Sequence, residues 1–274
     1  YSCYRNTRAT LRKLSLFVRG GKLLVKDVTP ALMASFRNYL IEQQHNSRNT
    51  VCENLKVIAR LLSEAGVEKN PCAELGLSRE QSERTYLLEE EVSRIMALHL
   101  KSENEMALAR DIFFAECRTG LRISDLLQLR WKNIQDGFIR IRMQKTRRKV
   151  EVPVTDSLML VFGKYRTLFS GPDSLVFPML ERYQVSGESF SRERRLISAT
   201  ARVNQLIKKV AERAGISKNI STHVGRHTFA TMLISKGATI YDVKELLGHH
   251  DMKVTQVYAH MIDRRKQELV KMLE

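Results

Sequence analysis

The stretch TGLRISDL at residues 119–126 carries Arg122, the first of two arginines on which the interpretation of this chain depends. The second, Arg226, lies in HVGRHTFAT at residues 223–231, three positions after His223. An arginine is always charged, and its rigid fork of donors fits the oxygens of a phosphodiester. Residues three apart share one face of a helix, so His223 and Arg226 can address the same phosphate. Taken alone, this pair is also explained by a structural or solvated His–Arg contact.

Two further strings follow along the chain, LLGHHD at residues 246–251 and VYAH at residues 257–260. The first carries His249 directly after the glycine that ends an expected short helix, a corner from which a side chain can project. The second carries Tyr258, which on its own is better explained as a half-buried aromatic residue. Lys145, at the entrance to a basic turn, is the sixth candidate.

Together, these six residues describe one site, in which cations and histidines surround a tyrosine. A tyrosine can attack a phosphate if positive charge is held where negative charge develops in the transition state. Free tyrosine has a pKa of about 10, so it needs help to lose its proton at neutral pH. The combination therefore favours a catalytic interpretation that no single residue supports.

The charge of the chain favours a polyanionic partner. Lys and Arg total 46 against 30 Asp and Glu, which gives a formal net charge of +16. Such an excess is typical of proteins that bind nucleic acids. The length of 274 residues allows one large or two smaller domains with a sizeable core. A basic protein without a nucleic-acid role is the alternative that charge alone leaves open.

Cysteine spacing and hydropathy argue against a zinc-binding, membrane-spanning or secreted protein. The cysteines are too scattered for a zinc site and are expected to be free thiols in a reducing cytoplasm: Cys3, Cys52, Cys72 and Cys117. No apolar run approaches the roughly 20 residues of a membrane span, and no secretory signal is found. The chain begins at Tyr1 rather than Met, which leaves open whether an N-terminal segment precedes it.

Residues 1–76 are expected to form a compact helical domain. Apolar residues recur at helical spacing over residues 4–18, and Thr29 followed by Pro30 is a start signal for a second helix. A third helix is expected from near Ser47 to Gly66. The polar segment SREQSERT then lacks periodicity, so residues 77–85 are interpreted as a linker.

Residues 86–274 are expected to form a second, mostly helical domain with a β-hairpin. Over residues 138–154 the side chains alternate, with one apolar and one polar set: Ile139, Ile141 and Met143 against Arg140, Arg142 and Gln144. The basic turn KTRRK joins the two strands. The expected fold class is mainly α, with an N-terminal helical domain and an α+β domain that carries a small β-hairpin or sheet.

The order and spacing of the four strings resemble those of the tyrosine recombinases, also called lambda-type integrases. The resemblance covers residues 86–274 and extends more loosely to the N-terminal helical domain, which is similar to the core-binding domain of that family. An ordered set of four motifs is far more specific than any one of them. The early helices look more similar to integrases of conjugative transposons, so a mobile-element integrase is expected.

The resemblance implies a role for five residues through their motifs. Arg122 in TGLR and Arg226 in HxxRH match the arginines that bind phosphate, and His223 matches the histidine that handles protons. His249 matches the residue that hydrogen-bonds the scissile phosphate. Tyr258, nine residues later, matches the nucleophile.

The sixth role is less specific. Lys145 matches the lysine that protonates the departing 5′ oxygen, but Lys149 in the same turn is an alternative, and a basic turn can also serve only as a contact to the DNA backbone. Asp125 is expected to be a structural partner of the first motif. Neighbouring histidines are expected to have core or surface roles: His227, His250 and His260.

The resemblance implies a site-specific recombinase that cleaves and rejoins double-stranded DNA through a covalent 3′-phosphotyrosine, without metal, cofactor or ATP. The chain has neither a GxxxxGK[ST] phosphate loop nor the clustered carboxylates of a two-metal nuclease. Self-association to a tetramer on paired sites, accessory DNA-bending proteins and a cytoplasmic, nucleoid-associated location are further expectations. An apolar stripe in residues 261–273 is expected to dock on a neighbouring protomer or on its own catalytic domain.

Other functions remain open at this point. A Xer-like chromosome-dimer resolvase uses the same residues, and a type IB topoisomerase or telomere resolvase uses similar chemistry. A non-catalytic DNA-binding regulator could share the fold, although binding alone has no use for Tyr258.

Overall fold

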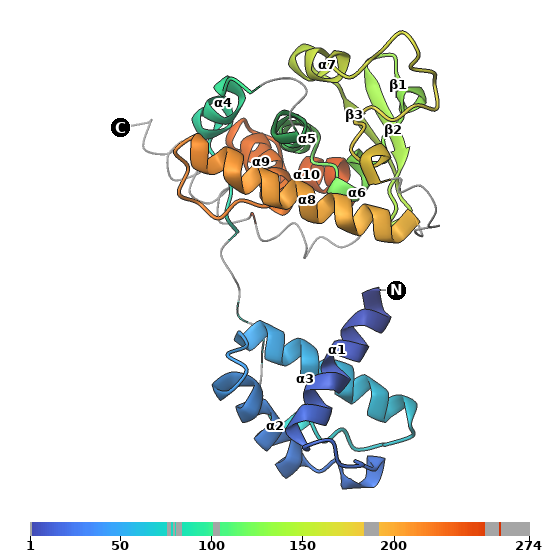
Figure 1. Cartoon of the computed structure of the whole chain (residues 1–274), viewed down its shortest axis with the longest axis vertical. Helices are drawn as coiled ribbons and strands as arrows, with labels where there is room; N and C mark the ends of the chain where they lie inside the picture. The colour runs from blue at the N-terminus through green and yellow to red at the C-terminus, as the bar shows by residue number, and fades with distance from the viewer. Residues whose placement is uncertain are drawn as a thin grey trace. The chain divides into compact units, whose positions relative to one another are not determined.

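The computed structural model describes residues 2–75, 78, 80, 84–100, 105–183, 192–249 and 258. The chain divides into two compact units, residues 1–83 and 84–274, each with its own hydrophobic core. Figure 1 shows the helices and strands of both units. The boundary falls within the segment interpreted as a linker, and the assignment of individual linker residues stays a prediction.

The N-terminal unit is built from α1 (Ser2–Phe17), α2 (Pro30–Glu42) and α3 (Arg48–Glu64), with the short 3-10 helices η1 (Val25–Asp27) and η2 (Ala73–Leu75). The hydroxyl of Thr29 accepts a hydrogen bond from the N–H of Leu32 and so caps α2, whose first residue is proline. Ser47 caps α3 in the same way. Met33, Phe36 and other apolar residues of the three helices pack into one core.

Two residues of the expected linker are attached to α3. Arg48 Nε donates to the carbonyl of Ser78 at 3.2 Å. Asn49 exchanges two hydrogen bonds with the backbone of Glu80, at 3.0 and 3.1 Å. These bonds join the start of the segment to the N-terminal unit.

The C-terminal unit is mostly helical. Its helices are α4 (Glu89–Ala97), α5 (Glu105–Thr119), α6 (Ile123–Leu126), α7 (Asp156–Gly163), α8 (Arg192–Arg213), α9 (Thr222–Ser235) and α10 (Ile240–Leu247), with the 3-10 helices η3 (Trp131–Asn133) and η4 (Glu181–Tyr183). The side chains of α5 are buried along almost its whole length, and this helix packs against α4, α8 and α9. It therefore lies at the centre of the unit (Figure 1).

A three-stranded antiparallel sheet lies to one side of this helical core, in the order β1 (Ile134–Gln135), β2 (Phe138–Arg142), β3 (Lys149–Pro153) (Figure 1). The predicted hairpin is confirmed, since Ile139 of β2 is buried opposite Val152 while Arg140 is exposed. The alternating pattern does not predict β1. This strand forms because Asp136 and Gly137 adopt positive φ values of 51° and 76° and make the tight turn for which Asp-Gly is preferred.

The end of α10 supports the hairpin. Thr239 and Asp242 cap the start of α10 reciprocally, and Gly248 ends the helix in the left-handed region with φ of 58°, as the sequence predicts. A Cβ at Gly248 would lie 2.7 Å from Met143 Sδ and 2.9 Å from Val150 Cγ1. Glycine therefore allows the hairpin to pack directly on the corner that carries His249.

The expectations about cysteines and membrane spans can be compared with the structure. Among the described residues, Cys52, Cys72 and Cys117 are not joined in disulfides. In the parts of the chain that the structure describes, every helix is too short or too polar to cross a lipid bilayer. The histidines at 250 and 260 and the apolar stripe in residues 261–273 lie outside the described residues.

Candidate active site

Arg226 joins three segments of the C-terminal unit. Its side chain is buried on α9, and its guanidinium donates to the carbonyls of Gly120 and, at 2.5 Å, of Leu247. The side chain thus ties the loop before α6 to the end of α10. Burial, followed by the nearby charge of Arg122, lowers the pKa of Arg226 to about 10, so the guanidinium is still charged at neutral pH.

Gly120 allows this close approach. Its φ is +63°, a region that residues with a Cβ rarely adopt. A Cβ at this position would lie 2.7 Å from Leu247 Cδ2 and would also collide with the ring of Phe229. Glycine is therefore required at position 120, because its carbonyl accepts a hydrogen bond from Arg226 while its Cα packs against Phe229 and Leu247.

Arg122 is the N-cap residue of α6 and is half-buried. Its Nη1 lies 3.2 Å from Met143 Sδ, just beyond the end of β2. Burial lowers the pKa of Arg122, and the nearby carboxylate of Asp125 acts in the opposite direction. Asp125 Oδ1 accepts a hydrogen bond from the N–H of Gln144 at 3.0 Å, so it also holds the entrance of the hairpin turn against α6.

His249 follows the glycine corner at the end of α10, and its side chain is buried. Its backbone carbonyl accepts a hydrogen bond from Arg148 of the hairpin turn at 2.6 Å. Burial and then the charges of Arg226 and Arg122 lower the pKa of His249 to about 3. The imidazole is therefore neutral at neutral pH and lies within electrostatic reach of both arginines.

His223 and Lys145 are the exposed members of the group. Loss of hydration lowers the pKa of His223, and so do the positive charges around it, those of Arg226, Lys145, Arg84 and Arg122. Lys145 is in the hairpin turn, whereas the alternative, Lys149, begins β3. The choice of Lys145 stays a prediction.

Tyr258 is only 3% exposed and packs with apolar side chains of α9 and α10, among them Phe229 and Leu247. Its hydroxyl is hydrogen-bonded to Nδ1 of His227, with ring centroids 5.8 Å apart. Burial raises the pKa of Tyr258 to about 12, while the charges of Arg226 and Arg84 act in the opposite direction.

The sequence does not assign His227 to the site. It follows Arg226 directly in HVGRHTFAT, and successive residues of a helix point in different directions, which favours a core or surface role. In the structure, His227 contacts Tyr258, and its Nε2 lies 3.2 Å from Nη1 of Arg84. The sequence holds no signal for the second contact, because Arg84 is in a segment without periodicity.

Glu116 is a second residue that sequence reasoning does not single out. It lies on α5 and is fully buried, and a Cβ at Gly225 of α9 would be 3.1 Å from its Oε2. Burial raises the pKa of Glu116 well above its ordinary value, and the charge of Arg226 is the largest opposing influence. A buried carboxyl group on α5 is therefore within electrostatic reach of Arg226.

The structure brings the six predicted residues into one electrostatic neighbourhood. The charge of Arg226 acts on His223, His249 and Tyr258, while Arg122 acts on the two histidines and on Arg226 itself. Fixed cations beside neutral imidazoles and a phenol can bind an anion and stabilise charge that develops on it. Within the described residues, no group of three or more His, Cys, Asp and Glu is arranged to hold a metal ion.

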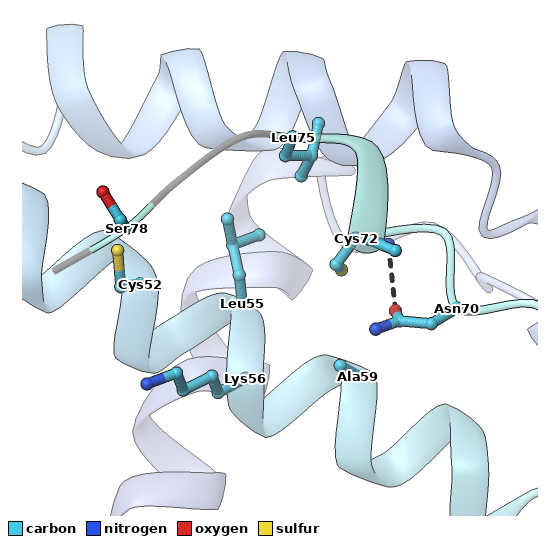
Figure 2. A pocket seen from close by; sticks show the side chains of 9 residues that line it. Cys52, Leu55, Lys56, Ala59, Asn70, Cys72, Leu75 and Ser78 are labelled. Carbon is cyan, nitrogen blue, oxygen red and sulfur yellow. Dashed lines mark hydrogen bonds between the residues drawn. The ribbon is translucent and has the colours of Figure 1, made fainter.

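The N-terminal unit has a pocket of its own, of about 340 Å³. Figure 2 shows side chains of α3, including Cys52 and Lys56, on one side and those of Asn70, Cys72, Leu75 and Ser78 on the other. Asn70 Oδ1 accepts a hydrogen bond from the N–H of Cys72 at 2.9 Å, which fixes the turn there. All the lining residues belong to the N-terminal unit.

Comparison with protein families covers most of the chain. The model of the phage integrase family matches residues 85–265. The model described as a phage integrase SAM-like domain matches residues 1–71.

Curated relatives are similar over both units. A tyrosine recombinase of Thermosipho africanus is 33% identical over 193 residues, which cover 69% of this chain and 61% of the relative. The tyrosine recombinase XerD of Shewanella oneidensis is 28% identical over 278 residues, which cover 96% of this chain and 87% of the relative. The chain spans 61% and 60% of the length of the Thermosipho relative and of one from Pseudothermotoga lettingae.

Solved structures share the fold at lower identity. XerH recombinase bound to a palindromic difH substrate matches with a TM-score of 0.71 at 19% identity, over 97% of this chain and 78% of that one. The Tn1549 transposon integrase in complex with transposon right end DNA matches with a TM-score of 0.66 at 15% identity, over 99% and 94%. The predicted fold class, mainly helical with a small antiparallel sheet, is confirmed.

Proposed function

Because the chain belongs to the phage integrase family, the tyrosine recombinases, we propose that it cleaves and rejoins double-stranded DNA at specific sites through a covalent 3′-phosphotyrosine. The observation that carries this proposal is the buried guanidinium of Arg226, whose charge acts on His223, His249 and Tyr258 at once. Core packing alone has no need for cations and histidines gathered around one tyrosine.

Cleavage begins with attack of the Tyr258 oxygen on the scissile phosphorus. The new tyrosine–phosphorus bond forms as the bond from phosphorus to the 5′ oxygen breaks, and the 5′ oxygen takes the electron pair. His223, which is exposed near the start of α9, accepts the phenolic proton. Lys145, in the exposed hairpin turn, supplies the proton that the departing 5′ oxygen needs.

The other residues stabilise the pentacoordinate transition state. Arg122 and Arg226 neutralise the non-bridging oxygens, and His249, neutral at physiological pH, donates a hydrogen bond to one of them. The phosphotyrosine conserves the energy of the broken bond. A 5′ hydroxyl of another strand can therefore attack it and restore the DNA backbone without ATP.

Double-stranded DNA and further copies of the same chain are the proposed partners. The Tn1549 and XerH structures named above are complexes with DNA, and one structural relative is a lambda integrase tetramer bound to a Holliday junction. By analogy, four copies assemble on paired sites in the nucleoid, with accessory DNA-bending proteins as candidates. We propose a mobile-element integrase, with a Xer-like resolvase as the alternative, and DNA flanking the gene distinguishes them by the presence or absence of element ends.

A nicked suicide substrate tests the proposed chemistry. The protein should form an SDS-resistant covalent complex with the 3′ phosphate, in EDTA and without nucleotide, because side-chain cations supply the positive charge. Tyr258→Phe should bind the same DNA but form no such complex. The matched control is Tyr241→Phe, since Tyr241 is a tyrosine of the same unit that is 67% exposed. Covalent trapping by Tyr258→Phe, or dependence on magnesium, would contradict the proposal.

A further inference from the structure

We propose that Arg84 and His227 are positioning residues for Tyr258, through a chain of hydrogen bonds in which Arg84 fixes the tautomer of His227 and His227 donates to the phenolic oxygen. This inference rests on the proposed function, in which Tyr258 is the nucleophile. It adds two residues that lie outside the six-residue set.

The position of Arg84 is fixed by the segment that follows it. Leu87 is 1% exposed, and its N–H donates to Oγ1 of Thr228 at 2.9 Å. Thr228 is itself fully buried and is the next residue after His227 on α9. The start of the C-terminal unit is therefore anchored beside α9, and the guanidinium of Arg84 reaches His227 from a segment with its own attachment.

The direction of the hydrogen bonds follows from the groups involved. A guanidinium has donors only, so His227 Nε2 accepts the bond from Arg84 at 3.2 Å and carries no proton. A neutral imidazole has one N–H, which must then be on Nδ1. Nδ1 is the atom bound to the Tyr258 hydroxyl, so His227 is the donor and the phenolic oxygen accepts.

The surroundings keep His227 neutral. Burial, followed by the charges of Arg84, His223 and Arg226, lowers the pKa of His227 to about 4. The charged groups that act on Tyr258 are Arg226 and Arg84, and both favour its phenolate. No carboxylate is among the groups that act on either ring in the described part of the chain.

A donor at this place has a defined chemical effect. The Nδ1–H leaves the phenolic proton free to depart toward another acceptor, so His227 is not the base. It stabilises negative charge as that charge grows on the attacking oxygen, and it holds the ring in one orientation. Arg84 makes this possible, because without it the proton of His227 could move to Nε2 and the bond to Tyr258 would reverse.

Substitutions can separate the donor from the ring. In His227→Asn, the amide nitrogen takes about the place of Nδ1 and can still donate. In His227→Leu, the volume is similar but no donor remains. Arg84→Lys keeps a donor to Nε2, whereas Arg84→Leu does not. His99→Leu is the matched control, because His99 is an exposed histidine of the same unit.

The decisive measurement is the single-turnover rate of covalent trapping on two suicide substrates, one ordinary and one with sulfur in place of the bridging 5′ oxygen. A thiolate leaves without a proton, so the sulfur substrate should restore Lys145→Ala. His227→Leu should be about 10- to 100-fold slower on both substrates, the range for losing a hydrogen bond to a charged group. His227→Asn and Arg84→Lys should be within a few fold of the unmodified chain, and Arg84→Leu should fall between.

The pH profile distinguishes a donor from a base. If His227 is a donor, His227→Asn keeps the shape of the wild-type profile between pH 5 and 8 at a lower rate. Loss of an acidic limb in His227→Asn would show a base and overturn the inference. Equal losses of cleavage rate in His227→Asn and His227→Leu, with melting temperatures unchanged, would also overturn the inference. Normal or faster cleavage by His227→Leu would overturn it as well. Failure of the unmodified chain to trap DNA would instead contradict the proposed function.

Discussion

Arg226 shows how one residue serves both the fold and the site. Its guanidinium is buried, a position that costs stability unless its donors are satisfied. The carbonyls of Gly120 and Leu247 provide partners, and the charge of Arg226 also acts on the buried carboxyl group of Glu116 on α5. The same two bonds fix the direction in which the charge is presented, so loss of the fork should affect folding and catalysis together.

A substitution that keeps the charge tests this dual role. Arg226→Lys retains a cation but cannot donate to both carbonyls in the planar arrangement of a guanidinium. We expect cleavage to fall roughly 100- to 1000-fold, the usual cost of removing one oxyanion donor, and the melting temperature to fall as well. Arg213→Lys, on the exposed end of α8, is the control. Trapping kinetics on a suicide substrate and calorimetry give the two readouts, and normal cleavage by Arg226→Lys would remove the fork from the mechanism.

The buried histidines predict how stability depends on pH. The folded pKa values of His227 and His249 are about 4 and about 3, below the ordinary value of 6.5. Below pH 6.5, the unfolded chain therefore binds protons that the folded chain does not, so stability is lost as pH falls from 6.5 toward 4. At pH 5 the loss is at most about 2 kcal/mol per histidine.

Calorimetry of the whole chain between pH 7.5 and 5 measures this loss. His227→Asn and His249→Asn remove one titrating group each, so each variant should lose less stability on acidification than the unmodified chain. His99→Asn, at an exposed position, should lose as much as the unmodified chain. Parallel curves for all four proteins would show that the two buried histidines do not titrate as described.

At the scale of elements, two glycines that pack closely against neighbouring side chains, Gly120 and Gly248, position the helices around the site. Gly120 brings the loop before α6 against Phe229 and Leu247, and Gly248 brings the end of α10 against the hairpin. Each has a positive φ and no space for a Cβ. The helices of the site are therefore positioned by the absence of side chains at two corners as much as by the apolar core.

Gly120→Ala tests the first corner, with Gly137→Ala as its control. Both glycines have positive φ, +63° and +76°, but a Cβ at Gly137 would meet nothing within 4 Å. Gly137→Ala should cost only the backbone strain, about 1 kcal/mol. Gly120→Ala should cost about 1–3 kcal/mol more because Phe229 and Leu247 must also move. Urea unfolding gives both values, and equal losses would show that the corner relaxes freely.

The sequence predicts the elements whose ends have capping residues. Thr29 with Pro30, Ser47, and Thr239 with Asp242 and Gly248 each bind backbone groups in the way their types suggest. The strand β1 and its Asp-Gly turn are missed because two residues are too short for periodicity, although the turn pair itself is a usable signal.

Within the candidate site, the motifs identify residues but not their contacts. All six side chains could be chosen from spacing and resemblance, and their roles stay predictions. The bond between His227 and Tyr258 could not be predicted, because it depends on how residues 31 positions apart meet in space. The contact with Arg84 spans 143 positions, and no local pattern records it.

At the scale of the whole molecule, each unit has a core of its own, so each can be tested as a separate fragment. The net charge of +16 predicts that DNA affinity falls steeply as the salt concentration rises, because binding releases counterions from the DNA and this release is less favourable at higher salt. We expect the two units to clamp a duplex together. Fragments 1–76 and 86–274 should each bind more weakly than the full chain when binding is measured across a salt series. A fragment that binds as tightly as the whole would contradict the clamp.

The contact between hairpin and corner also limits how this protein can be re-engineered. The hairpin packs against the Gly248–His249 corner through Met143, Arg148 and Val150. It therefore forms part of the surroundings of His249. A chimaera that borrows a relative's hairpin, for instance to alter DNA preference, also replaces that part of the surroundings. The smallest unit that can be exchanged is therefore two separate segments, residues 138–153 and 245–249. A chimaera that takes both segments from the same relative keeps the hairpin packed against the corner it evolved with.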